Sequence, residues 1–440
     1  MMSSTCFVMP VVAATALIIT LASPRSLCAE TLPKVSLVRL AEGFVSPVSL
    51  VPLPGSTDLA VVDQAGIVTV IDAAGNRRNR PLLDVRSKMT KLNGGFDERG
   101  LLSIAFHPRF SEKPLVYAYY SAPLQEGAPE DWDHTSHVSS FAVTEWKADL
   151  ASENVLLRIN QPQFNHNSGC LVFGQDGHLF ISTGDGGAGS DSGKGHVKGG
   201  NAQDIEQLLG KILRINVDGK APYTSPKDNP FVGVPGRDEI FAWGVRNPWG
   251  VVLDPNSPKQ LIIADVGQDR YAEVNIIKRG HNYGWHLCEG FEGFDPKKPR
   301  ATDVKKPRKD KFGNPLTDPV LVYKNIKHTE FKDDSDAVGS SITGGVVHAG
   351  DSIPELKGKY IFGDWSQQWT PAKGSLLVAD RSGNKWSMQP LRTVKHPDGL
   401  IDAYVTGFGN DTQGETYVLT SGQPGLGAVK GIVWKLSPAN

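Results

Sequence analysis

The chain has 440 residues and a nearly balanced charge, with 46 Lys and Arg against 47 Asp and Glu. This balance lacks the basic surplus with which proteins neutralise phosphates, so we expect no nucleic-acid partner. The 47 glycines and 30 prolines predict many short elements joined by turns, rather than a few long helices.

The first thirty residues differ from the rest. The run from Val8 to Ala22 is almost wholly apolar and is followed by small residues at 26–29. Its length suits the apolar region of a secretory signal and is short for a membrane span. We expect residues 1–29 to be a signal peptide, with an uncleaved anchor as the alternative, because no Lys or Arg precedes the run. The mature chain would then be periplasmic or secreted, without a membrane span.

From residue 30 to 440 a unit of two short apolar strands joined by an Asp, Gly or Pro turn recurs six times. The arms are rich in Val, Ile, Leu, Phe and Tyr, as strands are. The paired arms are 48–53 with 60–70, 101–106 with 115–120, 169–173 with 178–183, 249–253 with 260–264, 359–362 with 375–379, and 405–408 with 415–420.

This repetition predicts an all-β, six-bladed β-propeller formed by residues 30–440 as a single domain. A β-sandwich also has short strands at regular spacing, but about 410 residues without a compositional boundary is long for one. Two stretches are typical of insertions: Gly187–Gly200, rich in Gly and Ser, and Asp295–Pro315, rich in Lys and Arg. Ile205, Leu208 and Leu209 have helical spacing and predict a short helix over 204–213.

His166 stands just before one predicted strand, and Asp185 stands just after the next. Antiparallel pairing brings the start of one strand beside the end of its neighbour, so the two side chains should meet at one rim. A His with an orienting carboxylate is the basic unit of general-base catalysis. The alternative is that each residue only caps its own loop.

Two further polar clusters lie at strand ends. Arg246 and Asn247 occupy a turn fixed by Gly and Pro. A rigid Arg can stabilise a developing oxyanion. The alternative is that it donates hydrogen bonds to loop carbonyls and only holds the loop in place. The segment 265–275 combines carboxylates with a Gly turn, which suits a calcium site or a network of loop salt bridges.

The chain has four cysteines. Cys6 and Cys28 fall in or beside the predicted signal. Cys170 and Cys288 could pair in an oxidising compartment, or remain separate buried thiols. We favour separate thiols, because sequence cannot place their Cβ atoms near each other.

Ordered blocks of the sequence resemble the soluble quinoprotein sugar dehydrogenases, the glucose/sorbosone dehydrogenase family. The resemblance runs from about Leu37 to Leu436, nearly the whole mature chain. The blocks are 96–108, 166–169, 209–219, 244–248, 273–275 and 280–285.

The resemblance implies a six-bladed propeller that binds pyrroloquinoline quinone (PQQ) and calcium and oxidises a sugar by hydride transfer to the quinone. By match of motif, His166 would take the proton from the anomeric hydroxyl, and Asp185 would orient it. Arg246, with Asn247 beside it, would stabilise the oxygen of the reduced quinone. Glu98 would be a polar residue on the substrate side.

The same resemblance implies the calcium ligands. The backbone carbonyls of Gly267 and Gln268 match the position of a calcium that also contacts the quinone. Glu273 and Tyr283 match a separate, structural calcium site. The sugar and the electron acceptor are not specified by the sequence.

The sequence departs from this family in its last blades, where the soluble glucose dehydrogenases hold the cofactor carboxylates with a Lys and paired Arg residues. The matching stretches, 360–367 and 405–411, contain no Lys or Arg. Their Gly-Asp-Trp version resembles the hedgehog-interacting-protein branch, whose propeller is a binding module. A PQQ- and calcium-dependent sugar dehydrogenase is therefore the leading hypothesis. The alternatives are a non-catalytic propeller that binds a protein or glycan, and a hydrolase of the lactonase type.

Overall fold

The computed structural model describes residues 32–326 and 337–439. Contacts divide the chain into two units, Met1–Leu32 and Pro33–Asn440. The predicted signal peptide therefore lies outside the described residues, and every described strand belongs to the second unit. No helix in the described part of the chain is long and apolar enough to cross a membrane.

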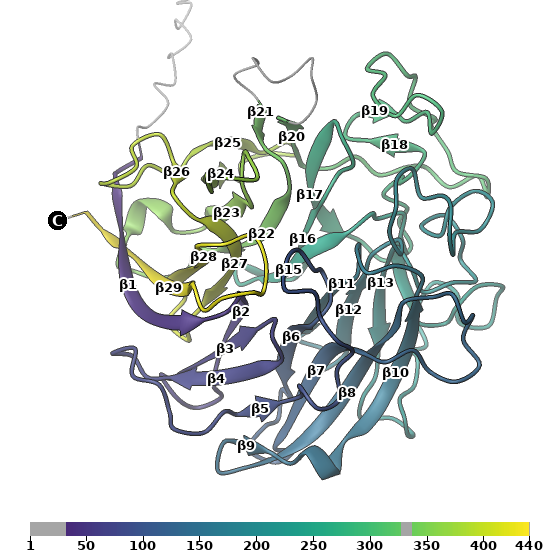
Figure 1. Ribbon diagram of the computed structural model, residues 1–440. Coiled ribbons are helices and arrows are strands. Elements are labelled where there is room, and N and C mark those ends of the chain that lie inside the picture. The colour runs from purple at the N-terminus through teal and green to yellow at the C-terminus, as the bar shows by residue number, and fades with distance from the viewer. Residues whose placement is uncertain (1–31, 327–336, 440) are drawn as a thin grey trace, which may run out of the picture. The chain divides into compact units, whose positions relative to one another are not determined.

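The second unit is all-β, as predicted, with two single-turn 3-10 helices at Leu150–Ser152 and Pro354–Leu356. Its largest sheet has the order β1-β29-β28-β27-β2-β3-β4-β5 and joins the two ends of the unit (Figure 1). Its strands are β1 (Val35–Phe44), β2 (Pro47–Pro52), β3 (Leu59–Asp63), β4 (Ile67–Ile71), β5 (Leu83–Asp84), β27 (Tyr404–Asn410), β28 (Thr416–Ser421) and β29 (Gly431–Pro438).

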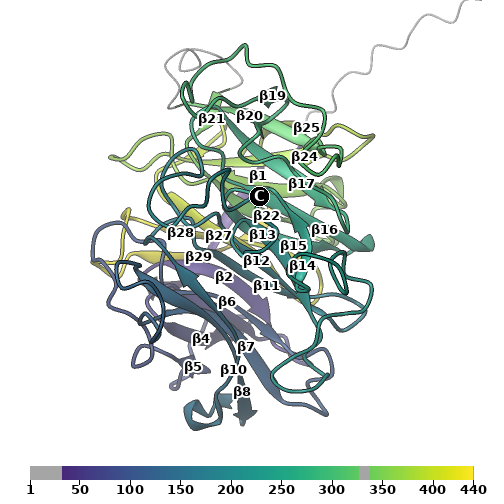
Figure 2. The ribbon, with the colours of Figure 1, turned by 90° about the vertical axis from the view of Figure 1, so that its right-hand side faces the viewer.

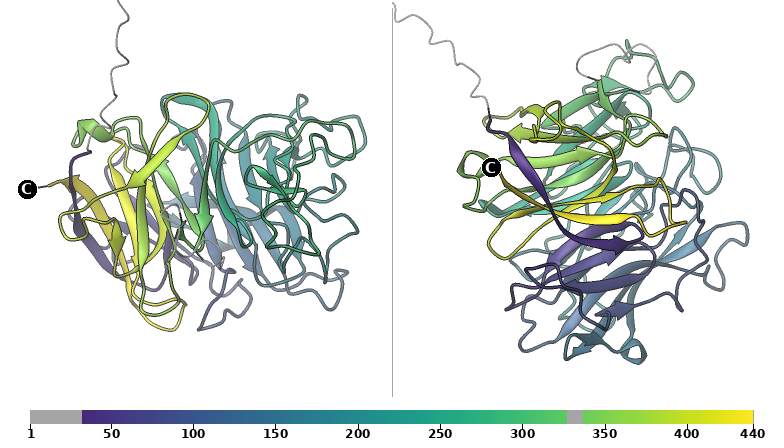
Figure 3. Two further views of the ribbon diagram at one scale, coloured as in Figure 1. Left: turned by 90° about the horizontal axis from the view of Figure 1, so that it is seen from above. Right: turned by 60° about the vertical axis from the view of Figure 1, so that its left-hand side comes forward.

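This sheet consists of two halves of four strands each. A single parallel pairing, Leu50 with Gly409, joins β2 to β27, whereas antiparallel ladders run through each half. The first strand, β1, pairs along most of its length with the last, β29, and the two lie side by side in both views of Figure 3. The beginning and end of the unit are thereby hydrogen-bonded to each other.

Two further antiparallel sheets come next along the chain. One has the order β10-β8-β7-β6 with β9 on β8, and the other β11-β12-β13-β14. Their strands are β6 (Leu101–Phe106), β7 (Leu115–Ala122), β8 (His134–Thr144), β9 (Lys147–Ala148), β10 (Asn154–Gln161), β11 (Ser168–Phe173), β12 (Leu179–Thr183), β13 (Lys211–Ile215) and β14 (Ile240–Trp243).

The remaining strands form two five-stranded sheets and a short hairpin. The orders are β15-β16-β17-β20-β21, β22-β23-β24-β25 with β26 on β24, and β18-β19. Their strands are β15 (Pro248–Asp254), β16 (Ser257–Asp265), β17 (Tyr271–Ile277), β18 (Cys288–Glu289), β19 (Glu292–Gly293), β20 (Leu321–Asn325), β21 (Ala337–Gly339), β22 (Ile342–Val347), β23 (Tyr360–Asp364), β24 (Gly374–Asp380), β25 (Ser387–Pro390) and β26 (Leu400–Ile401).

The first strand of each four- or five-stranded sheet, and of each half of the eight-stranded sheet, contacts the next such strand along the chain. β2 contacts β6, β6 contacts β11, β11 contacts β15, β15 contacts β22, β22 contacts β27, and β27 contacts β2 again. Figure 1 shows these strands towards the middle of the unit, and Figure 2 shows them from the side. The same ends of these strands are thereby brought together, so the loops that leave them can build one site.

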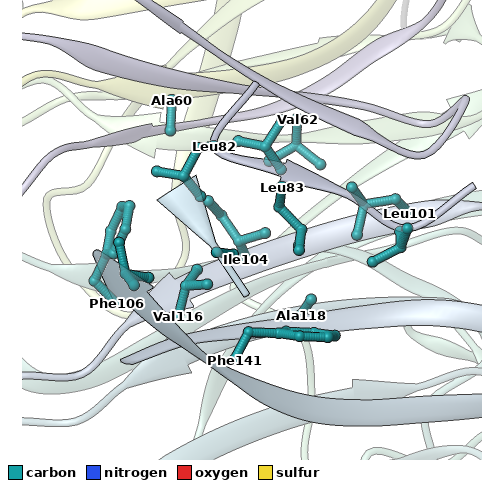
Figure 4. Packing of buried hydrophobic residues seen from close by; sticks show 14 of the residues in the cluster. Ala60, Val62, Leu82, Leu83, Leu101, Ile104, Phe106, Val116, Ala118 and Phe141 are labelled. Atoms are coloured by element: carbon teal, nitrogen blue, oxygen red, sulfur yellow. The ribbon is translucent and has the colours of Figure 1, made fainter. Parts of the chain in front are cut away.

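The core lies between the faces of neighbouring sheets. Figure 4 shows one such layer, in which residues of β3 and β5 pack against residues of β6, β7 and β8. Strands β3, β6 and β12 are buried at every position, because both faces of these sheets are covered. This explains why their sequences are runs of apolar residues rather than alternating patterns.

The predicted helix over 204–213 is wrong, because residues 201–210 form turns and Lys211 begins β13. Ile205, Leu208 and Leu209 are buried as predicted, but in irregular backbone. The fully buried Lys211 ammonium donates to the carbonyls of Asn201, Ala202 and Leu209, which replaces bonds that a helix would supply. Cys170 and Cys288 are both free, as the separate-thiol alternative predicts.

Candidate functional site

A cavity of about 450 Å³ opens where loops lead into the first strands of the sheets. This size lies within the roughly 300–1,000 Å³ of small-molecule sites. Six residues predicted from the sequence line the cavity: Glu98, His166, Arg246, Asn247, Gly267 and Gln268. They come from four separate stretches of chain, and Asp185 lies directly behind them.

His166 and Asp185 meet as predicted, at the start of β11 and just after the end of β12. His166 Nδ1 lies 2.7 Å from Asp185 Oδ1, and both side chains are almost completely buried. His166 has a left-handed backbone (φ 54°), which is strained for a residue other than glycine. Gly184 makes room for it, since a Cβ there would stand 1.9 Å from the His166 carbonyl oxygen.

The hydrogen bonds of His166 define its tautomer. Arg246 Nη2 lies 3.0 Å from His166 Nε2, and a guanidinium can only donate. His166 Nε2 therefore carries the lone pair, and Nδ1 carries the proton that it donates to Asp185. This arrangement places the lone pair of Nε2 at the cavity wall.

Arg246 is fixed from several sides. Its Nη1 donates to the carbonyls of Val266 and Gly267, each at 3.0 Å, and its backbone N–H donates to Asp265 at 2.9 Å. The guanidinium also lies 5.5 Å from the ring centre of Trp285. Asp265 accepts the Asn247 backbone N–H as well, and burial raises the pKa of its carboxyl to about 6. The turn holds Arg246 rigidly, as predicted, and its bonds to the Val266 and Gly267 carbonyls are those of the alternative in which the Arg ties down loop carbonyls.

Glu98 connects the histidine to Asn247. Its Oε2 accepts the backbone N–H of His166 at 2.7 Å and the side-chain amide of Asn247 at 3.1 Å. The Asn247 Oδ1 atom is buried and has no hydrogen-bond partner within the described residues. Buried polar groups are rarely left unpaired, and this oxygen lies next to Gly184, where a Cβ would stand 3.1 Å from it.

The segment 265–275 is held by a residue that the sequence did not single out. Glu289 Oε1 accepts the backbone N–H groups of Gln268, Asp269 and Arg270, at 2.7, 3.1 and 3.2 Å. Its other oxygen accepts from the buried Arg270 side chain at 3.0 Å. These bonds to Glu289 fix the backbone of the loop that carries Gly267 and Gln268.

Gly267, Glu273 and Tyr283 surround a small closed cavity next to Arg246. Burial, and then the nearby Asp265, raise the pKa of the Glu273 carboxyl to about 8. The Tyr283 hydroxyl donates to the Ile276 carbonyl at 2.7 Å. The described residues include no group of three or more His, Cys, Asp or Glu side chains arranged to hold a metal. A calcium here would depend on backbone carbonyls, of which Gly267 already accepts from Arg246.

The cavity suits the quinone part of PQQ, a planar aromatic with two adjacent carbonyls and three carboxylates. Arg246 and Asn247 offer polar contacts at one end. Phe96, Trp365 and Trp369 form an aromatic cluster at the wall, with ring centres 5.2 to 6.2 Å apart. The three carboxylates do not fit in the same way, because Arg246 is the one cation among the described lining residues.

Comparison with known proteins gives the same family as the sequence blocks. The family described as "Glucose / Sorbosone dehydrogenase" matches residues 44–401. The HIPL1 protein of Arabidopsis thaliana is 30% identical over 378 residues, covering 74% of this chain and 52% of that protein. The hedgehog-interacting protein of Mus musculus is 27% identical, covering 90% of this chain and 51% of that protein. The chain thus spans about half the length of these curated relatives.

Solved structures share the fold. The PQQ-bound form of an aldose sugar dehydrogenase from Streptomyces coelicolor superposes with a TM-score of 0.62 at 23% identity. The match covers 92% of this chain and 98% of that one.

Proposed function

Because this chain belongs to the glucose/sorbosone dehydrogenase family, we propose that it oxidises a CH–OH group of an aldose or related sugar, with a quinone as hydride acceptor. PQQ with calcium is the cofactor pair implied by the family resemblance. The observation that carries the proposal is the position of the His166 imidazole, with Nδ1 2.7 Å from Asp185 and Nε2 3.0 Å from Arg246 at the cavity wall.

We also propose that the second unit is a six-bladed β-propeller. The ring of contacts through β2, β6, β11, β15, β22 and β27 supports this arrangement. The pairing of β1 with β29 supports closure of the last blade by the first strand.

In the proposed reaction His166 Nε2 accepts the proton of the sugar hydroxyl as the C–H bond breaks. The Asp185 carboxylate, buried and 2.7 Å from Nδ1, stabilises the imidazolium that results. General-base catalysis of this kind contributes about 10²–10⁴-fold to a rate. A bound quinone would supply the hydride acceptor, and an electron acceptor of unknown identity would reoxidise it.

Arg246 has two parts in this scheme. In the structure its Nη2 donates to the lone pair that must accept the proton, so the guanidinium has to turn this donor away when a sugar binds. The released N–H groups can then stabilise negative charge that develops on an oxygen in the cavity. Its bonds to Val266 and Gly267 keep the group near that position.

The test is reduction of a dye acceptor by purified protein with calcium and a quinone, either PQQ or its uncharged trimethyl ester, against a panel of aldoses and related sugars. Turnover that requires both the sugar and the quinone would support the proposal. Folded protein that reduces no dye with any sugar would overturn it. A signal peptide at 1–29 and a periplasmic or secreted location remain part of the proposal, and cell fractionation tests them.

A binding module for a protein or glycan is the second candidate. It is supported by the relatives named for hedgehog interaction and by the single cation in the cavity. Binding of a partner with no quinone uptake would favour it. Hydrolysis of a lactone with calcium but without a quinone would favour a lactonase instead.

A further inference from the structure

The charge of the cavity does not suit a ligand with three carboxylates. Arg246 is the single cation among its described lining residues, whereas Asp97 and Glu98 are acidic. Asp97 forms an ion pair with the buried Arg99, at 2.8 Å. The remaining charges of the wall are the negative charge of Glu98 and the positive charge of Arg246, which balance each other. Asp185 and Asp265 are also fully or nearly buried directly behind the wall. Among the described residues an anionic ligand would therefore meet no excess of positive charge, and one bound calcium ion would offset two of three carboxylate charges.

Many of the neutral hydrogen-bond donors of the wall are also engaged elsewhere. Four of the five glutamine amides that line the cavity donate to backbone carbonyls of the protein: Gln64 to Asp97 and Arg99, Gln367 to Val338, Gln368 to Pro371, and Gln423 to Gly425 and Ala428. The fifth, Gln268, has its amide nitrogen 3.5 Å from an Asp269 carboxylate oxygen. Three hydroxyls of the wall are engaged in the same way: Ser340 to Ser366, Thr343 to Gly363, and Thr406 to Pro47. These side chains cannot replace the missing cations without losing bonds that they already make.

The apolar part of the wall is well suited to a flat ring. Phe96 and Trp369 are 36% and 55% exposed, although both pack against Trp365. Large aromatic side chains that stay exposed beside a cavity usually mark a binding surface. The cavity thus offers aromatic faces, acceptor oxygens and one guanidinium.

We infer that this cavity binds a planar quinone that carries at most one carboxylate group, and not a tricarboxylate such as PQQ. The inference rests on the proposed function, since it concerns the cofactor of the same site. A carboxylate that leaves water needs a cation or several donors, and the described wall offers one cation. A quinone with neutral substituents would keep the contacts to Arg246 and the aromatic cluster.

The test compares PQQ with its trimethyl ester, which has the same ring system and quinone but no carboxylate charge. Binding to the full chain is measured by tryptophan quenching and by calorimetry, so the readout does not depend on turnover. We expect the ester to bind about ten-fold or more tightly than PQQ, because it leaves no charge unpaired. Equal or tighter binding of PQQ would overturn the inference while supporting a quinone-dependent enzyme. Binding of neither compound would overturn the proposed function, and this inference with it.

A gain-of-charge variant tests the cause directly. Gln368 is exposed at the cavity mouth, so Gln368→Lys adds a cation there without burying it. In this variant the affinity for PQQ should rise several-fold, and this gain should shrink when salt is added. The affinity for the ester should not change. Gln413→Lys makes the same charge change at an exposed turn away from the cavity and should have no effect. An equal effect of both variants, or none of Gln368→Lys, would overturn the inference.

Discussion

Trp285 donates its indole N–H to Asp185 Oδ2 at 2.8 Å, while the guanidinium of Arg246 lies 5.5 Å from the centre of the same indole. One buried side chain thus positions both the carboxylate behind His166 and the cation in front of it. Asp185 Oδ1 faces the imidazole, so the indole fixes the second oxygen and with it the plane of the carboxylate.

Trp285→Phe removes this donor and keeps an aromatic ring under Arg246. We expect kcat for sugar oxidation to fall about 10-fold or more, because a hydrogen bond to a charged group contributes roughly 1.5–3 kcal/mol, with a small change in KM. Trp243→Phe is the matched control, because the buried Trp243 indole nitrogen has no partner within the described residues. Equal losses in both variants would indicate a purely structural role for Trp285.

His166→Ala should abolish dye reduction, by about 10²–10⁴-fold, and leave quinone binding nearly intact. The reason is that a general base acts in the transition state rather than in cofactor affinity. Stopped-flow turnover and tryptophan quenching measure the two quantities. His178 offers a matched control, since its Nδ1 lies 2.8 Å from Asp176 on the surface, and His178→Ala should change neither. Loss of quinone binding in His166→Ala would make the histidine structural.

The meeting of His166 and Asp185 could be predicted from the sequence, because it depends only on antiparallel pairing of two adjacent strands joined by a short turn. The strand Ser168–Phe173 does pair with Leu179–Thr183. Arg246 could be predicted as rigid from its Gly and Pro neighbours. These features are local, and local backbone geometry is readable from residue types.

Trp285 and Glu289 could not be predicted in the same way. Trp285 reaches Asp185 from 100 residues away, and such contacts depend on how separate sheets are placed around the cavity. The helix predicted over 204–213 is absent for a similar reason. The buried Lys211 ammonium donates to the backbone carbonyls of Asn201 and Leu209, in place of the hydrogen bonds of a helix. A side chain that binds backbone carbonyls in this way leaves no periodic pattern in the sequence.

Arg246→Ala should weaken both steps of the proposed reaction. Loss of a preorganised donor at a developing oxyanion costs about 10²–10³ in kcat, and loss of the contact to the quinone carbonyl should raise the dissociation constant of the quinone. Arg246→Lys keeps the charge but cannot reach Nε2 and two carbonyls together, so it should recover binding more than turnover. Arg279→Ala, at an exposed Arg paired with Asp228, is the control. An Arg246→Ala variant with normal turnover would remove Arg246 from the mechanism.

The loop after Asp185 contains a buried pair of titratable groups, His196 and Asp191. His196 donates from Nδ1 to Asp191 at 2.7 Å, and Asp191 also accepts the backbone N–H groups of Asn201 and Ala202. Burial of the His196 imidazole opposes its charged form, but Asp191 and the nearby Asp185 outweigh burial and raise its pKa above the usual 6.5. Burial also opposes the charged form of Asp191, but the bonds from His196 and the backbone outweigh it and lower the pKa of Asp191.

The two pKa shifts affect the stability of the folded protein on opposite sides of one pH range. A raised His pKa means that the folded state binds the proton more tightly than the unfolded chain. This contribution is fully present below about pH 6.5 and is lost as pH rises through the raised His196 pKa. A lowered Asp pKa contributes stability above about pH 4 that is lost as pH falls towards the lowered value. The contribution of the pair should therefore be largest between these limits, near pH 5 to 6.

Thermal unfolding of wild type and His196→Gln between about pH 4 and 8 checks this sign. The neutral amide of Gln can keep a hydrogen bond to Asp191 but cannot titrate, so the difference in melting temperature should be largest near pH 5 to 6 and shrink towards pH 8. His286 Nδ1 lies 3.6 Å from the other Asp191 oxygen. His286→Gln, made alone and together with His196→Gln, therefore separates the contribution of His286 to the pH dependence of stability from that of His196. A difference that grows from pH 6 to pH 8 would contradict the assignment, because it would mean that burial prevails and that His196 is neutral in the folded protein.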